Sequence, residues 1–256
     1  MVLQKIARVF GGDPHKREIE ELSFNAWPAL QTLMFDGWII RFADGYSKRA
    51  NSVNPVYDSR IDIEEKISAC EQMYRGKNLP VVFKLTASVH PENLDDILRS
   101  HEYQMDSTTS VQTLGLIEGY GIREVELNET CTGEWLSGVY RLNNVGEKIQ
   151  PTIQRMLGNI IPKKCFAIIR REDQGIAYGF GVLQNKYIGL YDVVVDQSFR
   201  NQGYGRRLIF SLLAWGKQNY AQKAYLQVML DNAPALHLYP RLGFQEAYQY
   251  WYRIKR

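Results

Sequence analysis

The sequence predicts an α/β protein with a mixed sheet, in which some neighbouring strands are parallel and others antiparallel. Two observations predict this fold class. Hairpin-type turns at Asp36-Gly37 and Asp173-Gln174-Gly175 each separate two short apolar runs, which is typical of antiparallel pairs. Elsewhere, apolar runs of strand length alternate with stretches of helical period, which indicates parallel strand–helix–strand units.

The first half contains signals for five strands and three helices. Apolar residues at helical spacing support the helix after position 60, at Ile63, Ile67, Cys70 and Tyr74. The expected elements are, in order, a short helix at 18–22, a turn at 25–29, strands at 31–35 and 38–42, a strand ending near Val53, a helix at 61–75, a strand at 80–86, a helix at 91–101 and a strand at 103–116.

A cluster of glycines, Gly115, Gly119 and Gly121, separates the two halves, so we expect one domain at 1–118 and another at 119–256. The elements expected in the second half are a helix at 134–143, a hairpin of strands at 165–171 and 175–183, a strand at 187–195, a helix at 206–220, a strand at 224–229, a helix at 233–242 and a strand at 244–254.

Composition excludes several classes of protein. Of 256 residues, 45% are hydrophobic and 23% are charged, which is ordinary for a globular chain. No stretch approaches the roughly 18 apolar residues of a membrane span, and the net charge of +3 is too small to indicate nucleic acid. Residues 1–13 lack a signal-peptide core, and Cys70, Cys131 and Cys165 fit neither a disulfide framework nor a metal site. We therefore expect a cytoplasmic protein that uses no metal and binds neither membrane nor nucleic acid.

The two halves resemble each other at a steady offset of 141 to 143 residues, which predicts the same fold twice. The matching positions are Val53 with Val195, Phe83 with Leu226, and Tyr103 with Phe244.

The copies differ where chemistry is expected. The first half has Ile61 opposite Gly203, Ile63 opposite Gly205, and Leu98 opposite Tyr239. We therefore place the chemistry after about residue 120.

A glycine turn joins a valine-rich strand to an amphipathic helix, in the segment Arg200-Asn201-Gln202-Gly203-Tyr204-Gly205. The unpaired amides and the positive end of the helix dipole favour a bound phosphate at such a turn. A P-loop is excluded because Arg206 and Arg207 follow Gly205 where Lys-Ser/Thr is required. A dinucleotide fold is excluded because Leu208 stands at the third glycine position.

This turn resembles the acyl-CoA loop of the GNAT superfamily of N-acetyltransferases, whose pattern is Gln/Arg-x-x-Gly-x-Gly/Ala. Residues 232–244 are similar to a second family motif, Asn-x-x-Ala-x-x-Leu-Tyr-x-x-Leu-Gly-Phe, at the expected distance downstream. The resemblance is strong from Tyr187 to the end and weak before it. Pro240 departs from the family, where a polar helix former is usual, and predicts a local kink.

The resemblance implies two tandem GNAT-like domains, of which the first is degenerate and only the second is catalytic. It implies that acetyl-CoA, or another short acyl-CoA, lies between the strands at 187–195 and 224–229, with its pyrophosphate on the glycine turn. The cofactor-binding residues that it implies are Val193, Val194, Val195, Arg200, Asn201, Gln202, Gly203, Tyr204, Gly205, Arg206 and Asn232. Asn232 is also a candidate N-cap of the helix that follows it, and capping is compatible with a contact to the cofactor.

The resemblance implies that Tyr239 protonates the departing thiolate. A phenol near pKa 10 and a thiol near 8.5 differ by about 1.5 units, or roughly 2 kcal/mol. Asp192 is the preferred general base, because an acid within a valine strand is costly unless it is used or paired. Tyr191, Glu134 and His237 are weaker candidates. A β-bulge would reverse the facing of Tyr191 and Asp192, so strand parity does not choose between them.

These residues predict an acyl-CoA-dependent N-acyltransferase that moves an acetyl group to a primary amine by direct attack in a ternary complex. The acceptor is expected to be a small-molecule amine or a peptide N-terminus. The alternative is a non-catalytic acyl-CoA-binding sensor or interaction module, which has no need of an acid at Tyr239. The sequence gives neither the acceptor nor the oligomeric state.

Overall fold

A computed structural model describes residues 14–121 and 124–256, so the predicted absence of a signal peptide at 1–13 falls outside the described residues. The chain divides into two compact units. Unit 1 holds the described residues up to Ser110 together with Tyr248–Arg256, and unit 2 holds Val111–Ala247. Both units mix helices with strands, which confirms the predicted α/β class.

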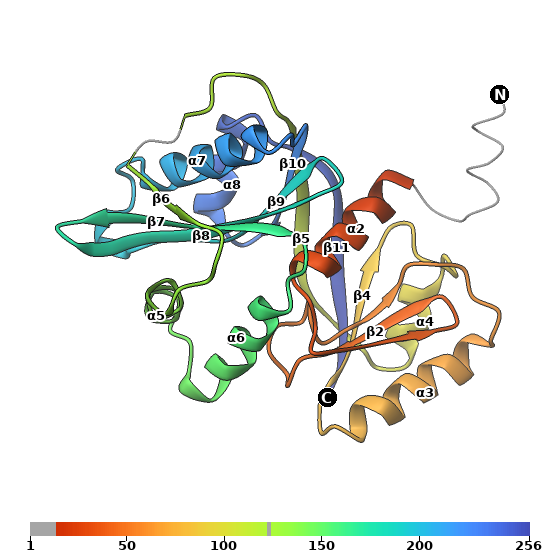
Figure 1. Cartoon of the computed structure of the whole chain (residues 1–256). Coiled ribbons are helices and arrows are strands. Elements are labelled where there is room, and N and C mark those ends of the chain that lie inside the picture. The colour runs from red at the N-terminus through yellow and green to blue at the C-terminus, as the bar shows by residue number, and fades with distance from the viewer. Residues whose placement is uncertain (1–13, 122–123) are drawn as a thin grey trace, which may run out of the picture. The chain divides into compact units, whose positions relative to one another are not determined.

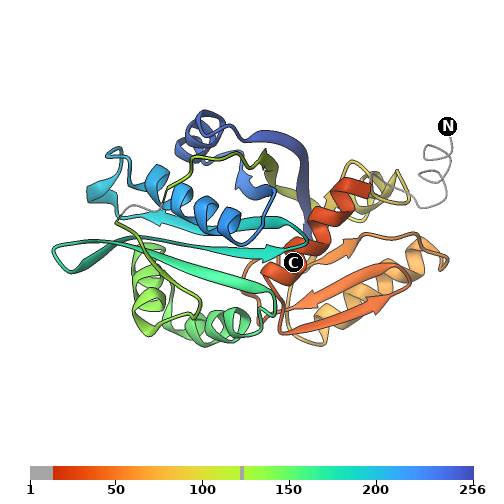
Figure 2. The same cartoon turned by 45° about the horizontal axis from the view of Figure 1, so that its top comes forward.

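Unit 1 is a mixed sheet with two helices packed on one face (Figures 1 and 2). The β1–β2 hairpin turns at Asp36-Gly37, as predicted, with Phe35 opposite Trp38. The strand order is β1-β2-β3-β4-β11-β5. The elements are α2 (Pro14–Ala26), β1 (Gln31–Phe35), β2 (Trp38–Phe42), β3 (Val53–Pro55), α3 (Ile63–Arg75), β4 (Val81–Thr86), α4 (Leu94–Ser100) and the parts of β5 (Gln104–Gly115) and β11 (Gln245–Lys255) that lie in this unit.

Within unit 2 the strand order is β5-β10-β9-β8-β7-β6, with β9 and β10 parallel and β7, β8 and β9 antiparallel. Its further elements are β6 (Glu126–Asn128), α5 (Gly133–Leu142), the 3-10 turn η1 (Glu147–Ile149), α6 (Gln150–Gly158), β7 (Lys163–Arg171), β8 (Gln174–Gln184), β9 (Tyr187–Val195), the 3-10 turn η2 (Gln197–Phe199), α7 (Tyr204–Gln218), β10 (Lys223–Met229) and α8 (Ala233–Arg241).

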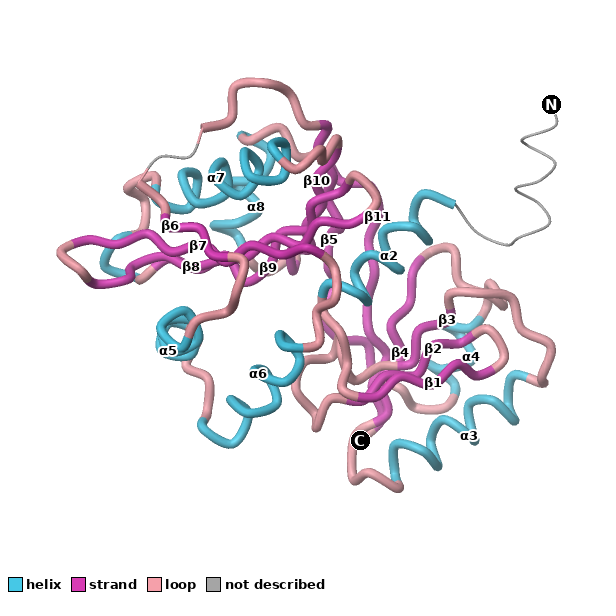
Figure 3. The backbone as a smooth tube through the Cα atoms, in the orientation of Figure 1, coloured by secondary structure: helices cyan, strands magenta, loops and turns pink. Residues whose placement is uncertain are grey.

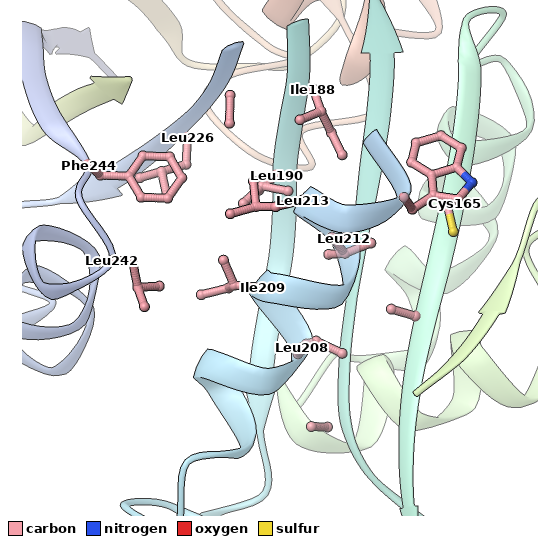
Figure 4. Close-up of a cluster of buried hydrophobic side chains, with 14 of the residues drawn as sticks. Cys165, Ile188, Leu190, Leu208, Ile209, Leu212, Leu213, Leu226, Leu242 and Phe244 are labelled. Carbon is pink, nitrogen blue, oxygen red and sulfur yellow. The ribbon is translucent and has the colours of Figure 1, made fainter. Parts of the chain in front are cut away.

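Helices cover both faces of the unit 2 sheet. In Figures 1 and 3, α7 lies on one face and α5 lies on the other. The apolar side of α7, with Leu208 and Leu212 fully buried, packs on Ile188 and Leu190 of β9 (Figure 4). This packing anchors the start of α7 next to the end of β9, because the helix follows the strand after one short loop.

Some elements differ from the sequence-based expectations. The first helix runs to Ala26, so the expected turn at 25–29 is wrong in its first two residues. β6 was not expected, since three residues are too few for an alternation pattern. α6 was not expected either, although Ile153 and Met156 are buried at helical spacing and Pro151 fits a first turn.

Within the described residues, none of the helices has the length and apolar character that a membrane crossing requires. The same residues contain no group of three or more His, Cys, Asp and Glu side chains placed to hold a metal ion.

Candidate active site

A gap opens between the two parallel strands of unit 2. β9 and β10 pair in parallel register only as far as Leu190 and Leu226. Beyond them, β9 continues to Val195 and stays paired with β8 on its other edge. The edge of β9 that faces β10 therefore carries backbone groups beyond Leu190 that neither of the two described neighbouring strands takes up.

A β-bulge interrupts β9 at Asp192. The register with β8 shifts so that Tyr178 faces Val194 but Phe180 faces Tyr191, and Asp192 has a positive φ of 47°. The bulge shifts the alternation of side chains by one residue. Val193 consequently packs against the α7 core, a face that regular alternation would give to Val194.

The bulge decides which way Tyr191 and Asp192 face, a point that strand parity leaves open. Tyr191 is buried on the α5 face, where its ring stacks on Phe180 at 5.3 Å between centroids. Its hydroxyl lies 2.8 Å from that of Tyr225 on β10. Asp192 is half-buried at the point where the gap begins, which keeps it the better candidate for contact with a reactant.

The glycine turn places a row of open amides at the start of α7. Gly203 is the N-cap residue in the left-handed region, with φ 84°, and provides no side-chain cap. The amide of Arg207 is the first to close the helix, onto the carbonyl of Gly203 at 3.0 Å. Within the described part of the chain, the amides of Asn201 to Arg206 donate to no protein acceptor. They form a ready anion site with the helix dipole behind them.

Arginines surround this turn but differ in their contacts. Arg200 donates from Nε to the carbonyl of Val195 at 3.2 Å, which braces the end of β9. Arg206 is exposed, with its guanidinium over the ring of Phe210 at 5.0 Å. Arg207 forms an ion pair with Glu124, whose side chain is exposed, and this pair offsets part of the positive charge of Arg207.

One contact of the turn was not expected from the sequence. Arg171, at the end of β7, donates to the hydroxyl of Tyr204 at 3.1 Å. The hairpin of β7 and β8 creates this contact, and no local pattern around Arg171 indicates it.

The second motif contributes α8. Asn232 caps this helix, with its side chain accepting from the amide of Ala235 at 3.3 Å, and it remains exposed. The ring of Tyr239 packs on Phe244 at 5.9 Å between centroids. Its hydroxyl has no hydrogen-bond partner among the described residues, and burial raises the pKa of Tyr239 to about 12. Pro240 lies inside α8, and the helix continues past it to Arg241.

The fold brings the two motifs together. A Cβ atom on Gly205 would lie 3.5 Å from Leu238 of α8 and 3.7 Å from Val195 of β9. The end of β9, the start of α7 and the middle of α8 therefore meet at one place. Tyr239 packs against the same buried cluster as these elements.

Of the three weaker candidates for the base, the two besides Tyr191 also have other contacts. His237 is exposed on α8, with Nδ1 at 3.1 Å from the carbonyl of Ala233. Glu134 forms a two-pronged ion pair with Arg170, and one of its two contacts measures 2.6 Å. Both carboxylate oxygens of Glu134 are thereby engaged with Arg170.

The sequence model of the family described as "Probable histone acetyltransferase Rv0428c C-terminal" matches residues 15–253. The chain belongs to this family. Because the match spans nearly the whole chain, unit 1 is as much a part of the family's sequence as unit 2 is.

Two proteins that this chain resembles in sequence are named as N-acetyltransferases. The chain is 27% identical over 252 residues to the uncharacterized N-acetyltransferase YobR of Bacillus subtilis, across 94% of this chain and 98% of that protein. It is 36% identical over 58 residues to the ribosomal protein bS18-alanine N-acetyltransferase of Escherichia coli, across 23% of this chain and 39% of that protein. The chain is thus a GNAT-type N-acetyltransferase.

Solved structures confirm the predicted GNAT fold. A GCN5-related N-acetyltransferase from Kribbella flavida superimposes with a TM-score of 0.65 at 12% identity, over 93% of this chain and 95% of that one. A tandem GNAT protein from the clavulanic acid biosynthesis pathway gives a TM-score of 0.64 at 11% identity, over 93% and 87%. That the first half is a degenerate copy of the second stays a prediction.

Proposed function

We propose that unit 2 of this N-acetyltransferase transfers an acetyl group, or another short acyl group, from acyl-CoA to a primary amine by direct attack in a ternary complex. The observation that carries the proposal is the row of open amides from Asn201 to Arg206 at the start of α7. A protein seldom leaves such donors together without a ligand or water to accept from them. Arg200 and Arg206 add positive charge for a pyrophosphate.

The β9–β10 gap suits an extended chain that carries amides. The backbone of Val193, Val194 and Val195 borders the gap. Those of its groups that pair neither with β8 nor, at the carbonyl of Val195, with Arg200 can hydrogen-bond a pantetheine arm as a further strand would. An amide of this stretch can also polarise a thioester carbonyl and stabilise the oxyanion that develops on it. Asn232 contributes a contact from the start of α8 while it caps that helix.

Two side chains move protons in the proposed reaction. Tyr239 donates its phenol proton to the thiolate that leaves, since its hydroxyl has no competing partner within the described residues. Asp192 removes a proton from the acceptor amine, directly or through water, at the mouth of the gap. An α-amine near pKa 8 is roughly a tenth unprotonated at pH 7, so it needs less help than a lysine near 10.4.

The acceptor is proposed to be a small-molecule amine or a peptide N-terminus. The name of the partial relative from Escherichia coli states that it acts on an alanine of a ribosomal protein. A low-pKa α-amine also fits a site with one candidate base. The free thiols of Cys70, Cys131 and Cys165 fit the reducing cytoplasm that we propose as its compartment.

The alternative, a non-catalytic acyl-CoA sensor, requires the amides and the gap but not Tyr239. The hydroxyl of Tyr239, which has no hydrogen-bond partner in the part of the chain that the structure describes, favours the enzyme, because a side chain that only packs against the core has no use for a hydroxyl.

Substitution of Gly203 tests the anion site. We expect Gly203→Glu to bind acetyl-CoA at least about tenfold more weakly than Gly203→Gln, because both variants carry the same strain at φ 84° but only Glu brings a negative charge to the phosphate position. Isothermal titration calorimetry gives both dissociation constants. Gly146→Glu, at an exposed glycine with nothing within 4 Å of its Cβ position, controls for charge alone. Equal affinity of the Glu and Gln variants would end the assignment of the loop.

A further inference from the structure

A salt bridge joins α5 to the loop that precedes α7. Arg141, in the last turn of α5, donates from Nη1 to Oδ2 of Asp196 at 3.0 Å. Its Nη2 donates to the carbonyl of Gly175 at 2.9 Å, and it also hydrogen-bonds the buried hydroxyl of Tyr178. These contacts fix the direction of the guanidinium, so Arg141 holds Asp196 at a defined position relative to β8.

Asp196 is the first residue after β9, and its amide and both of its carboxylate oxygens have partners. Its amide donates to the carbonyl of Ile176 on β8 at 2.8 Å. Its Oδ1 accepts from the amide of Ser198 at 3.0 Å and so caps the turn η2, while its Oδ2 faces Arg141. The hydrogen bond from Ser198 is the largest influence that holds the pKa of Asp196 below its usual value, so the carboxylate is ionised at neutral pH.

The open amides depend on this capped turn for their position. The chain from Asp196 to Gly203 is exposed for most of its length and has few other attachments. Arg200 reaches back to the carbonyl of Val195 at 3.2 Å, and Gln202 reaches back to that of Ser198 at 3.3 Å. The first attachment holds the turn to the end of β9, and the ring of Phe199 packs against the buried cluster around α7. The link from Asp196 to Arg141 is the side-chain contact that ties the turn to α5, on the other face of the sheet.

We infer that Arg141 is a positioning residue for the acyl-CoA loop: through Asp196 it holds the η2 turn so that the amides of Asn201 to Arg206 converge on one anion. The inference rests on the proposed function. An exposed ion pair adds little to overall stability, so the effect falls on the loop rather than on the fold. A loop that keeps its binding-competent conformation for only a tenth to a fifth of the time binds five- to tenfold more weakly.

The test uses the full chain and a double-mutant cycle. Arg141→Met removes the guanidinium, and Asp196→Asn keeps an acceptor for Ser198 but removes the charge. We expect each variant to raise the calorimetric dissociation constant of acetyl-CoA about five- to tenfold with little change in kcat. The double variant should have a dissociation constant no higher than that of the single variant that binds acetyl-CoA more weakly.

Arg170→Met is the matched control. Arg170 also joins α5 to the sheet, through Glu134, but touches no residue of the loop. It is expected to lower stability at least as much as Arg141→Met and to leave the dissociation constant within twofold of the wild type. Hydrogen exchange of the hydrogen-bonded amides of Ser198, Phe199 and Arg200 in the ligand-free protein is expected to speed up in Arg141→Met and not in Arg170→Met.

The outcomes separate the two hypotheses. A wild type that binds no acetyl-CoA would refute the proposed function, and the hydrogen exchange of the ligand-free protein would still decide whether Arg141 holds the loop. The positioning role would be overturned if Arg141→Met bound acetyl-CoA as tightly as the wild type. It would also be overturned if the free-energy effects of the two single substitutions on acetyl-CoA binding added up in the double variant. Unchanged exchange at the amides of 198–200 would overturn it as well.

Discussion

In the proposed mechanism, single residues set the acid–base chemistry, and Tyr239 is the clearest case. Burial raises the pKa of its phenol to about 12, so it stays protonated throughout the neutral range. Transfer of its proton to a thiolate of ordinary pKa near 8.5 is uphill by about 3.5 units, or roughly 5 kcal/mol, more than the free phenol requires. A thiolate that forms in the same apolar surroundings also has a raised pKa, which narrows the difference.

We expect Tyr239→Phe to lower kcat about a hundredfold and to change the dissociation constant of acetyl-CoA less than twofold, because only the hydroxyl is lost. Since the phenol ionises only near pH 12, the wild-type rate should show no loss from Tyr239 as pH rises from 6 to 10. Steady-state kinetics of thiol release across this range, with calorimetry alongside, measures both effects. An unaltered kcat would remove Tyr239 from the mechanism.

At the scale of elements, close packing fixes α5 against the sheet. Gly138 of α5 lies over Tyr178 of β8, where a Cβ atom would be 2.0 Å from Cζ and 2.3 Å from the hydroxyl oxygen. No side chain fits at this position, so glycine allows the helix to approach the strand. The approach also brings Arg141 within reach of Asp196.

Gly138→Ala is therefore expected to destabilise the protein by about 1–3 kcal/mol, because Tyr178 is buried and cannot move aside freely. Gly133→Ala on the same helix is the control: nothing lies within 4 Å of its Cβ position, and alanine favours a helix by up to about 1 kcal/mol. Urea denaturation compares the two variants. Equal stability would show that α5 does not pack as described.

At the scale of the whole molecule, the two units differ in how they treat a comparable helix start. At the start of α3 in unit 1, Asp62 accepts from the amides of Glu64 and Glu65 at 2.9 and 3.3 Å. Asp36 accepts two more amides from the residues just before α3. These carboxylates use the donors and repel an anion, whereas the amides at the start of α7 are open.

Unit 1 also lacks the acid, because Leu98, the predicted counterpart of Tyr239, is fully buried in its apolar core. We therefore expect one acetyl-CoA per chain. The stoichiometry of a calorimetric titration measures this directly. A stoichiometry of two would show that unit 1 retains a site and would contradict the degenerate first half.

Much of the candidate site could be predicted from the sequence because its determinants are local. The φ of 84° at Gly203, the open amides beside it and the cap at Asn232 each depend on a few consecutive residues. The hairpin at Asp36-Gly37 and the apolar side of α7 are local in the same sense. α6 was missed although its pattern is local, and β6 was missed because it is too short to have one.

By itself, then, the sequence determined the α/β class, the order of most elements and the position of the glycine turn before α7, since backbone conformation and side-chain period follow from neighbouring residues. Only the tertiary structure decided which face Tyr191 takes, where β9 and β10 part, and that Arg141 meets Asp196 across 55 positions and Arg171 meets Tyr204 across 33. Such contacts depend on strand register and on the packing of helices against the sheet, which no short stretch of the chain specifies.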